Sequence, residues 1–425
     1  MIKKNIHIVI VLLCIFANFW ASFFLSSIGW QEMDRFIVSP NKYFSETVIE
    51  LERISIALMV ISILFIIRNN KNNDQYSRNI KKYVCKNVGL AEFVFWGLIV
   101  MHIMGISFDN SLRGVGQFEL SKRGGMTIFF SQIVHALSLP FILFLLYMKP
   151  FKRKNTLYLI ILLAVYVLDG VSGGGRRALS YMVISLSIFF CTFKPQEVKM
   201  YKSIPILILF VFLYGLSLNL RRMGGDVEDI QQNSIEATQI EVNSQSNGME
   251  NTLQNSISAF LKTNSDPSFL WGVKEYKELG ITMQPIDFLY HFTSIFLPSS
   301  LYVMLMGKIS YTRSVFLFDY WFNDNPNQGY DFMVLADFYW CFGKIGYFLY
   351  VLVFAFILWY YQRNIRSGTF WRSMSAILII LYFCQQRNDF GAVLKPFVYE
   401  TLILILIQWF FIRKETFNNV IHLDK

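Results

Sequence analysis

Charged residues are scarce in this sequence. Asp, Glu, Lys and Arg make up 16% of the 425 residues, whereas hydrophobic residues make up 54%, and ordinary soluble domains carry about 25% charge. Cysteine is sparse as well, because there are five cysteines, mostly in or beside apolar runs, and an odd number implies no disulfide framework. These shortages exclude an ordinary soluble domain and a disulfide-stapled secreted one.

Several motifs of site chemistry are also missing. The five histidines show no ligand spacing, and there is no paired-aspartate nucleotide-sugar motif, phosphate-cradling glycine loop or zinc-protease helix. We therefore expect no metal and no cofactor, and we expect no nucleic acid among the partners.

Long apolar runs are what the sequence has in their place. Stretches of about 20 apolar residues, enough to cross about 30 Å of hydrocarbon, recur along the whole chain. The first run follows a basic start like a signal peptide, but it is long and has no small-residue cleavage site, so we read it as a retained helix. The sequence predicts an all-α polytopic integral membrane protein of about ten transmembrane helices, at 6–27, 49–67, 88–108, 126–148, 156–170, 178–193, 203–220, 339–361, 373–390 and 391–412.

The orientation of these helices follows from the basic residues of the short loops, which stay on the cytoplasmic side. With both termini inside, the following five segments are cytoplasmic, and each of them is basic: 68–86, 149–155, 194–202, 362–372 and 413–419. A further apolar segment, 286–306, is long enough to span, but a single crossing there would invert everything after it. We expect it to be interfacial or re-entrant.

This topology divides the chain into four parts. Residues 1–220 hold helices one to seven, 221–338 form a large outer loop, 339–412 hold helices eight to ten, and 413–425 form a cytoplasmic tail. The loop begins rich in Asn, Gln, Ser and Glu and becomes dense in aromatic residues and carboxylates, a composition suited to binding a sugar chain. We expect the functional surface to be this loop and the outer ends of the helices.

Six arginines in the outer loop or at outer helix ends run against the usual charge bias. Arginine binds phosphate oxygens with two parallel hydrogen bonds, which lysine cannot do, and three glycines beside one pair permit an anion-binding turn. The alternatives are arginines that snorkel to lipid headgroups and a plain helix-breaking loop. The predicted diphosphate-binding residues are Arg176, Arg177, Arg221, Arg222, Arg313 and Arg387, with Gly173, Gly174 and Gly175 as the turn.

Two stretches carry a resemblance to a known family. The turn "SGGGRRAL" and the later "NQGYDFMVLADFYWCFGKIGY", separated by one large outer loop, resemble the bacterial O-antigen or oligosaccharide repeat-unit polymerases. In that family a glycine and a small-residue stretch precede an acidic residue, an aromatic residue and a Phe-Gly-x-x-Gly turn. The matching positions are Gly329, Ala336, Asp337, Tyr339, Phe342, Gly343 and Gly346, with Asp where the family more often has Glu.

The resemblance implies a GT-C-like, metal-independent glycosyltransferase in the bacterial cytoplasmic (inner) membrane, with its active site facing the periplasm. Such an enzyme joins undecaprenyl-diphosphate-linked repeat units, so the implied partners are a lipid-linked glycan donor and acceptor, membrane lipid and a chain-length regulator protein. The alternatives are an O-antigen ligase, which transfers the glycan to a lipid core, and a flippase for lipid-linked oligosaccharides, which is a transporter. A membrane acyltransferase is disfavoured because no suitable early histidine is present.

Under this reading the acceptor hydroxyl requires a base. Asp337 is the first candidate and His291 the second; the alternatives are a helix cap for Asp337 and a surface histidine on an interfacial helix for His291. Aromatic residues near the same helix ends can stack on sugars or anchor the chain at the membrane interface. The candidates for sugar binding are Tyr320, Trp321, Tyr330, Tyr339 and Trp340.

Overall fold

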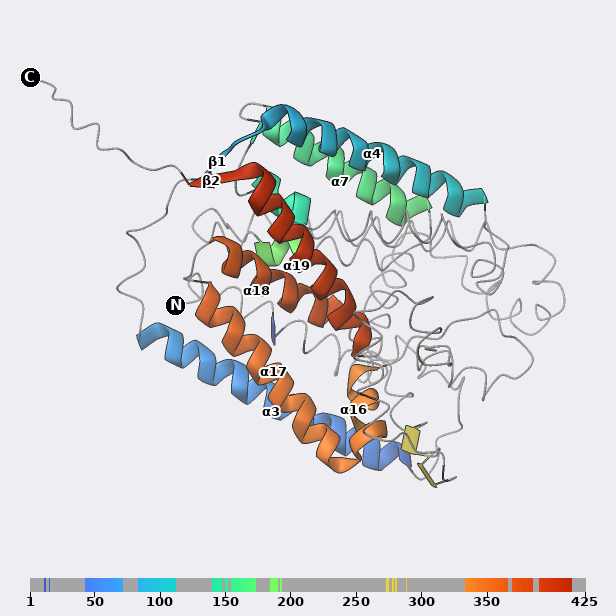
Figure 1. Ribbon diagram of the computed structural model, residues 1–425. Helices are drawn as coiled ribbons and strands as arrows, with labels where there is room; N and C mark the ends of the chain where they lie inside the picture. The colour runs from blue at the N-terminus through green and yellow to red at the C-terminus, as the bar shows by residue number, and fades with distance from the viewer. Residues whose placement is uncertain are drawn as a thin grey trace, which may run out of the picture.

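The computed structural model describes part of the chain, and Figure 1 draws that part as ribbons. The described residues are 11, 12, 15, 43–71, 83–111, 140–146, 150, 151, 154–172, 184–189, 192, 273, 274, 277, 278, 280, 288, 333–365, 369–384 and 390–414.

The described chain is helical apart from one short ribbon of two strands. The apolar runs fold as helices because a helix satisfies its backbone hydrogen bonds within the segment. The helices are α3 (Tyr43–Lys71), α4 (Val88–Ser111), α7 (Asn155–Ser172), α16 (Val334–Phe342), α17 (Lys344–Asn364), α18 (Thr369–Cys384) and α19 (Gly391–Phe411). The strands are β1 (Tyr83–Cys85) and β2 (Ile412–Lys414).

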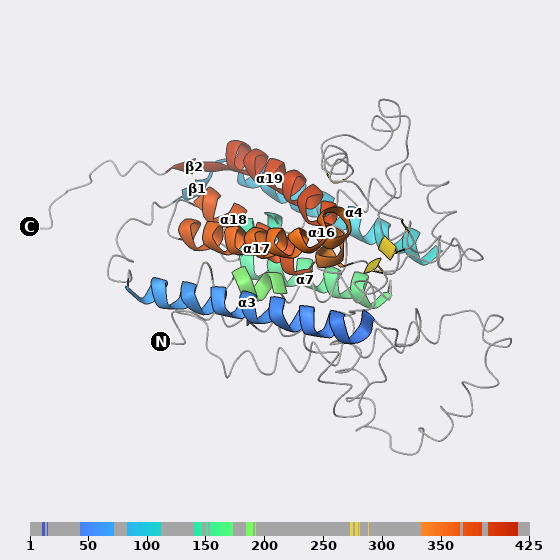
Figure 2. The ribbon, with the colours of Figure 1, turned by 90° about the horizontal axis from the view of Figure 1, so that it is seen from below.

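The helices pack in two groups that the ribbon connects. In the first group α3 contacts α17, α17 contacts α18 and α18 contacts α19, while α4 and α7 pack together as a pair (Figures 1 and 2). The ribbon is antiparallel, with Tyr83 opposite Lys414 and Cys85 opposite Ile412. It joins the start of α4 to the end of α19, and the backbone N–H of Lys86 donates to Phe411 O at 2.9 Å.

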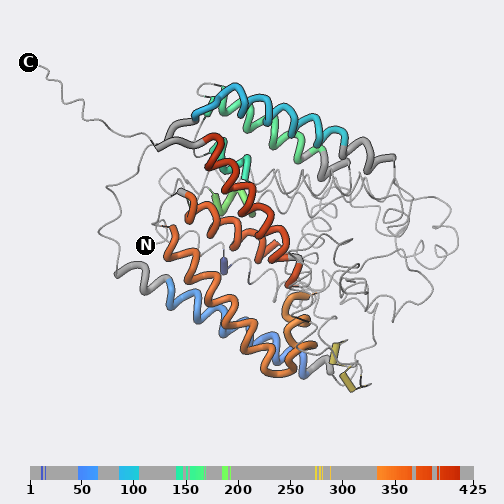
Figure 3. The backbone as a smooth tube through the Cα atoms, in the orientation of Figure 1, coloured from blue at the N-terminus to red at the C-terminus, as the bar shows by residue number. Residues whose placement is uncertain are grey.

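The long helices run between two ends of the molecule, which the tube in Figure 3 makes easy to follow. The ribbon end holds β1, β2, the last turn of α3, the starts of α4, α7 and α18 and the last turn of α17. The opposite end, here called the α16 end, holds the start of α3, α16, and the starts of α17 and α19 (Figure 1). The described parts of four basic segments, 68–86, 149–155, 362–372 and 413–419, lie at the ribbon end.

Several helices present apolar side chains outward. Two of the described helices, Lys344–Asn364 and Val393–Phe411, are long and apolar enough to cross a membrane, and shorter apolar stretches lie in α4, α7 and α18. The outward faces of α4, α17 and α19 carry large hydrophobic residues. The most exposed of them are Phe93, Ile345, Phe348 and Trp409.

The predicted helices at 49–67, 88–108, 156–170, 373–390 and 391–412 overlap α3, α4, α7, α18 and α19, so the helical character of the shared residues is confirmed. α18 runs from Thr369 to Cys384, however, and Phe390 already lies at the start of α19. The predicted helix at 339–361 differs, because Gly343 interrupts it and divides it into α16 and α17. Of the predictions at 6–27, 126–148 and 178–193 only a few helical residues are described, of 286–306 only Phe288, and 203–220 lies outside the described residues.

Candidate functional site

A turn between two helices shapes the α16 end. Gly343 adopts φ 61° and ψ −142°, a left-handed conformation that side chains disfavour, and its N–H donates to Tyr339 O at 2.7 Å. Gly346, one turn into α17, lies against the backbone of α16, where a Cβ atom would overlap the carbonyl of Phe338. The positive φ angle therefore favours glycine at Gly343, whereas close packing against the backbone of α16 requires glycine at Gly346.

Two carboxylates project from the first turns of α3 toward the same end. Glu46 and Glu50 are four residues apart and so share one face of the helix. Glu46 lies in the first turn, where a negative charge interacts favourably with the helix dipole. Their exposures differ, since the side chain of Glu46 is 51% exposed and that of Glu50 is 14% exposed.

A buried lysine from residues 221–338 reaches these carboxylates. The Lys274 side chain is 4% exposed, and its Nζ lies 2.6 Å from Glu50 Oε2 and 3.8 Å from Glu46 Oε2. Among the described residues, the contact between Lys274 Nζ and Glu50 Oε2 is an ion pair and not a hydrogen bond. Because Lys274 Nζ lies closer to Glu50 than to Glu46, it neutralises the charge of Glu50 more strongly than that of Glu46.

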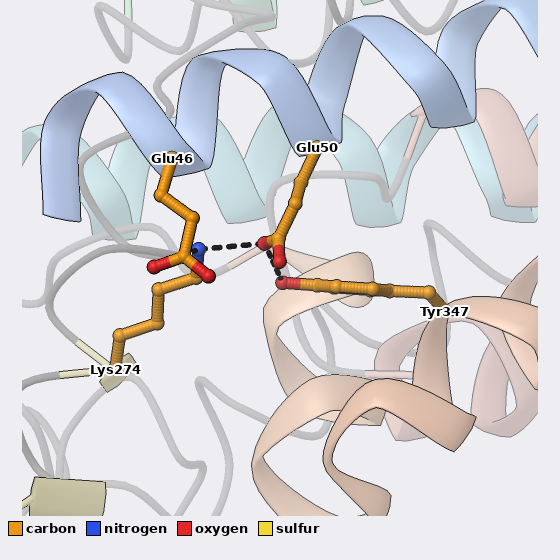
Figure 4. A network of polar contacts seen from close by, with 4 residues as sticks. All are labelled: Glu46, Glu50, Lys274 and Tyr347. Carbon is orange, nitrogen blue, oxygen red and sulfur yellow. Dashed lines mark hydrogen bonds and ion pairs between the residues drawn. The ribbon is translucent and has the colours of Figure 1, made fainter.

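Tyr347 completes this group from the first turn of α17. Its hydroxyl donates to Glu50 Oε2 at 2.5 Å, so Glu50 receives both a cation and a hydroxyl donor (Figure 4). We call Glu46, Glu50, Lys274 and Tyr347 the Lys274 cluster. It ties together α3, α17 and the segment around residue 274, which are far apart in the sequence.

A second lysine extends the cluster over α16. The ring of Tyr339 stacks on that of Tyr347, with centroids 4.9 Å apart, and Lys277 Nζ lies 4.9 Å from the Tyr339 ring centroid. Lys277 also donates to the carbonyl oxygen of Tyr339 at 3.5 Å, near the end of α16 where a positive charge is favourable. Burial lowers the pKa of Lys277 below its ordinary value.

Asp337 occupies a different position at the same end. Its side chain is fully buried in the first turn of α16, and Oδ2 accepts the backbone N–H of Phe390 at 3.1 Å. The carbonyl of Phe390 in turn accepts the N–H groups of Val393 and Leu394, so Phe390 begins α19. The carboxylate thus binds the amino terminus of α19, where negative charge is stabilised. Asp337 therefore caps α19, whereas the sequence suggested that it would cap the next helix along the chain.

The structure describes three of the predicted site residues. Asp337 and Tyr339 contact the groups given above, while Trp340 is 1% exposed and belongs to the hydrophobic core. The ring of Tyr339 is already engaged by Tyr347 and Lys277. The other predicted site residues lie outside the described residues: Arg176, Arg177, Arg221, Arg222, Arg313, Arg387, His291, Tyr320, Trp321, Tyr330, Gly173, Gly174 and Gly175.

Sequence reasoning missed the Lys274 cluster. The available signals were the Glu46 and Glu50 pair at one-turn spacing at the start of an apolar helix, and two lysines three residues apart in "WGVKEYKELG". Each is an ordinary charge pattern, and only the fold brings the two together.

The chain matches no family model, no curated protein and no solved structure. Among the residues that the structure describes, no group of His, Cys, Asp or Glu is arranged to hold a metal ion. The α16 end presents the exposed carboxylate of Glu46 and the neutralised carboxylate of Glu50, together with Lys274, Lys277, Tyr339 and Tyr347. Such groups can accept hydrogen bonds and protons from hydroxyl groups and can pack against sugar rings.

Proposed function

We propose that the chain crosses the membrane several times, with the ribbon end in the cytoplasm and the α16 end outside. Two observations support this orientation. The helices expose large apolar side chains along their lengths, and the described parts of four basic segments gather at the ribbon end, which is the side where membrane proteins keep Lys and Arg.

At the outer end, the proposed activity is a polysaccharide polymerase. It joins undecaprenyl-diphosphate-linked oligosaccharide repeat units in the biosynthesis of O-antigen or a related surface polysaccharide. The observation that carries this proposal is the contrast between the two ends, since carboxylates, lysines and tyrosines that can bind sugar hydroxyls meet at the end opposite the basic segments. The resemblance of "NQGYDFMVLADFYWCFGKIGY" to the repeat-unit polymerases gives the reaction class.

The chemistry has two requirements. The leaving group is a lipid diphosphate, whose developing charge the arginines can stabilise without a metal; Arg176 and Arg177 are the proposed residues, with Arg221, Arg222, Arg313 and Arg387 in support. The attacking hydroxyl must also lose a proton, for which sequence analysis offers Asp337 and His291.

The test is polymer formation by the purified full-length chain in nanodiscs with lipid-linked repeat units. Wild type should make polymer, and Arg176→Ala or Arg177→Ala should abolish it at an unchanged protein level. Lysine at the same position should rescue only in part, because it keeps the charge and loses the two-pronged geometry. Arg363→Ala is the matched control. Arg363 is exposed in the last turn of α17, at the ribbon end, where its guanidinium lies over the ring of Trp359.

The outcomes separate the candidate functions. Full-length polymer from both alanine variants and their double variant would reject the diphosphate role of this pair. Transfer of the glycan to a lipid core without chain growth would indicate a ligase, and movement of lipid-linked units across the bilayer without bond formation would indicate a flippase. Deleting the gene distinguishes the same three, because loss of a polymerase leaves single repeat units on the acceptor.

A further inference from the structure

Glu46 and Glu278 are exposed carboxylates at the α16 end, and Glu46 is the one that belongs to the Lys274 cluster, which matters for the proposed reaction. A general base must come within hydrogen-bond reach of the hydroxyl from which it takes a proton. Asp337 is fully buried and already accepts the N–H of Phe390. Glu46 is 51% exposed and lies in the first turn of α3, which begins at this same end.

The surrounding charges separate the two glutamates by role. Lys274 lies 2.6 Å from Glu50 and 3.8 Å from Glu46, and the hydroxyl of Tyr347 donates to Glu50 as well. One oxygen of Glu50, Oε2, is therefore used by the protein, and the Glu50 side chain is only 14% exposed. Glu46 has only the longer contact with Lys274 among the ion pairs of the described residues, and its exposed side is open to a ligand.

From this geometry we infer that the Lys274 cluster is the binding site for the acceptor saccharide, with Glu46 as the catalytic base. This inference rests on the proposed function. The attacking hydroxyl of the acceptor sugar donates a hydrogen bond to the Glu46 carboxylate. Lys274, Glu50 and Tyr347 are positioning residues, because they fix the start of α3 against α17 and the segment around residue 274 (Figure 4).

The reaction step balances without a metal or a redox partner. The acceptor O–H bond breaks and its proton moves to the Glu46 carboxylate, while the oxygen forms a bond to the anomeric carbon of the donor sugar. The bond from that carbon to the diphosphate oxygen breaks, and its electron pair leaves with the lipid diphosphate. The neutral carboxylic acid then returns its proton to water.

The decisive comparison is Glu46→Gln against Glu52→Gln in the nanodisc assay. Glutamine keeps the size and removes the basicity, so turnover should fall by about 100- to 10,000-fold while the KM for the lipid-linked unit changes much less. Glu46→Asp should restore part of the turnover. Glu52 is an exposed carboxylate six residues, nearly two turns, further along α3, and its variant should behave as wild type.

The positioning role has its own readout. Lys274→Met alone should lower turnover because Glu50 loses its cation, and adding Glu50→Gln should recover much of it because the buried charge is gone. A loss of stability alone would also be recovered in the double variant, so turnover is compared per folded enzyme, well below the unfolding temperature of every variant. Thermal unfolding of each variant in detergent, matched to wild type, shows whether the fold is intact.

The results distinguish this inference from the proposed function. A wild-type chain that makes polymer together with a fully active Glu46→Gln variant overturns the role of Glu46 and leaves the polymerase standing, and a dead Asp337→Asn variant would then return the base to Asp337. A wild-type chain that makes no polymer overturns the proposed function, and the inference falls with it.

Discussion

Removing the positive charge of Lys274 should destabilise the fold, because Glu50 would keep its charge in a mostly buried position without its cation, and replacing Lys274 with Met tests this. Met keeps the apolar stem of the lysine and removes its charge. Breaking a buried pair by removing one partner costs about 3–5 kcal/mol. The Tyr347 hydroxyl still donates to Glu50 after the change, and such a bond to a charged group contributes about 1.5–3 kcal/mol.

The expected cost is therefore below that range. Because Glu50 keeps one donor and is 14% exposed to water, we expect Lys274→Met to lower the free energy of unfolding by about 2–3 kcal/mol. The double variant with Glu50→Gln removes both charges and should cost about 1 kcal/mol or less, so adding Glu50→Gln to Lys274→Met should recover about 1–2 kcal/mol.

The assay is reversible unfolding in mixed detergent micelles, applied to the single and double variants as a double-mutant cycle. Lys154→Met is the matched control, because Lys154 is paired with Glu92 at 3.7 Å with 68% of its side chain exposed. An exposed pair of that kind contributes about 0–1 kcal/mol. Equal costs for the two lysine variants, or strictly additive costs in the cycle, would refute the reasoning.

Three further outcomes are expected. Gly346→Ala should lower the free energy of unfolding by about 1–3 kcal/mol, because the new Cβ would overlap the backbone of α16. Gly97→Ala should raise it by about 0.5–1 kcal/mol, because a Cβ at Gly97 would meet no atom within 4 Å. Equal effects of the two variants would disprove the packing argument. The lowered pKa of Lys277 means that the folded state binds its proton less well than the unfolded state, so wild-type stability should rise relative to Lys277→Met as pH increases through the lowered value toward 10.5; parallel pH profiles would contradict this. A reporter fused after Asn247 should be active only outside the cell and one after Asn79 only inside, and the reverse pattern would overturn the proposed orientation.

The helices were largely predictable from the sequence because each is a local apolar run. The bounds of α4 and α19 agree closely with the predicted 88–108 and 391–412. The prediction at 339–361 continued through Gly343 because apolar residues continue on both sides of it. The sequence did indicate a turn at Phe342 and Gly343, but hydropathy alone does not report a left-handed backbone angle.

The candidate site was less predictable because its contacts join distant segments. Lys274 meets Glu50 across more than half of the chain, and a pairing of that kind leaves no periodic pattern in either segment. Asp337 was the first candidate for the base, a role in which its carboxylate must reach the acceptor hydroxyl. Its burial against the start of α19 depends on a hydrogen bond to Phe390 that no local signal indicates.

The β1 and β2 ribbon has a consequence for the order in which the molecule is assembled. Tyr83 pairs with Lys414, so a strand made early in synthesis receives its partner only after α19 has been made. Until then the N–H and C=O groups on that edge of β1 must be hydrated, and a strand edge of this kind is a template for wrong pairing. Closing so long a loop is slow compared with helix formation. The ribbon therefore cannot close before α19 has been made.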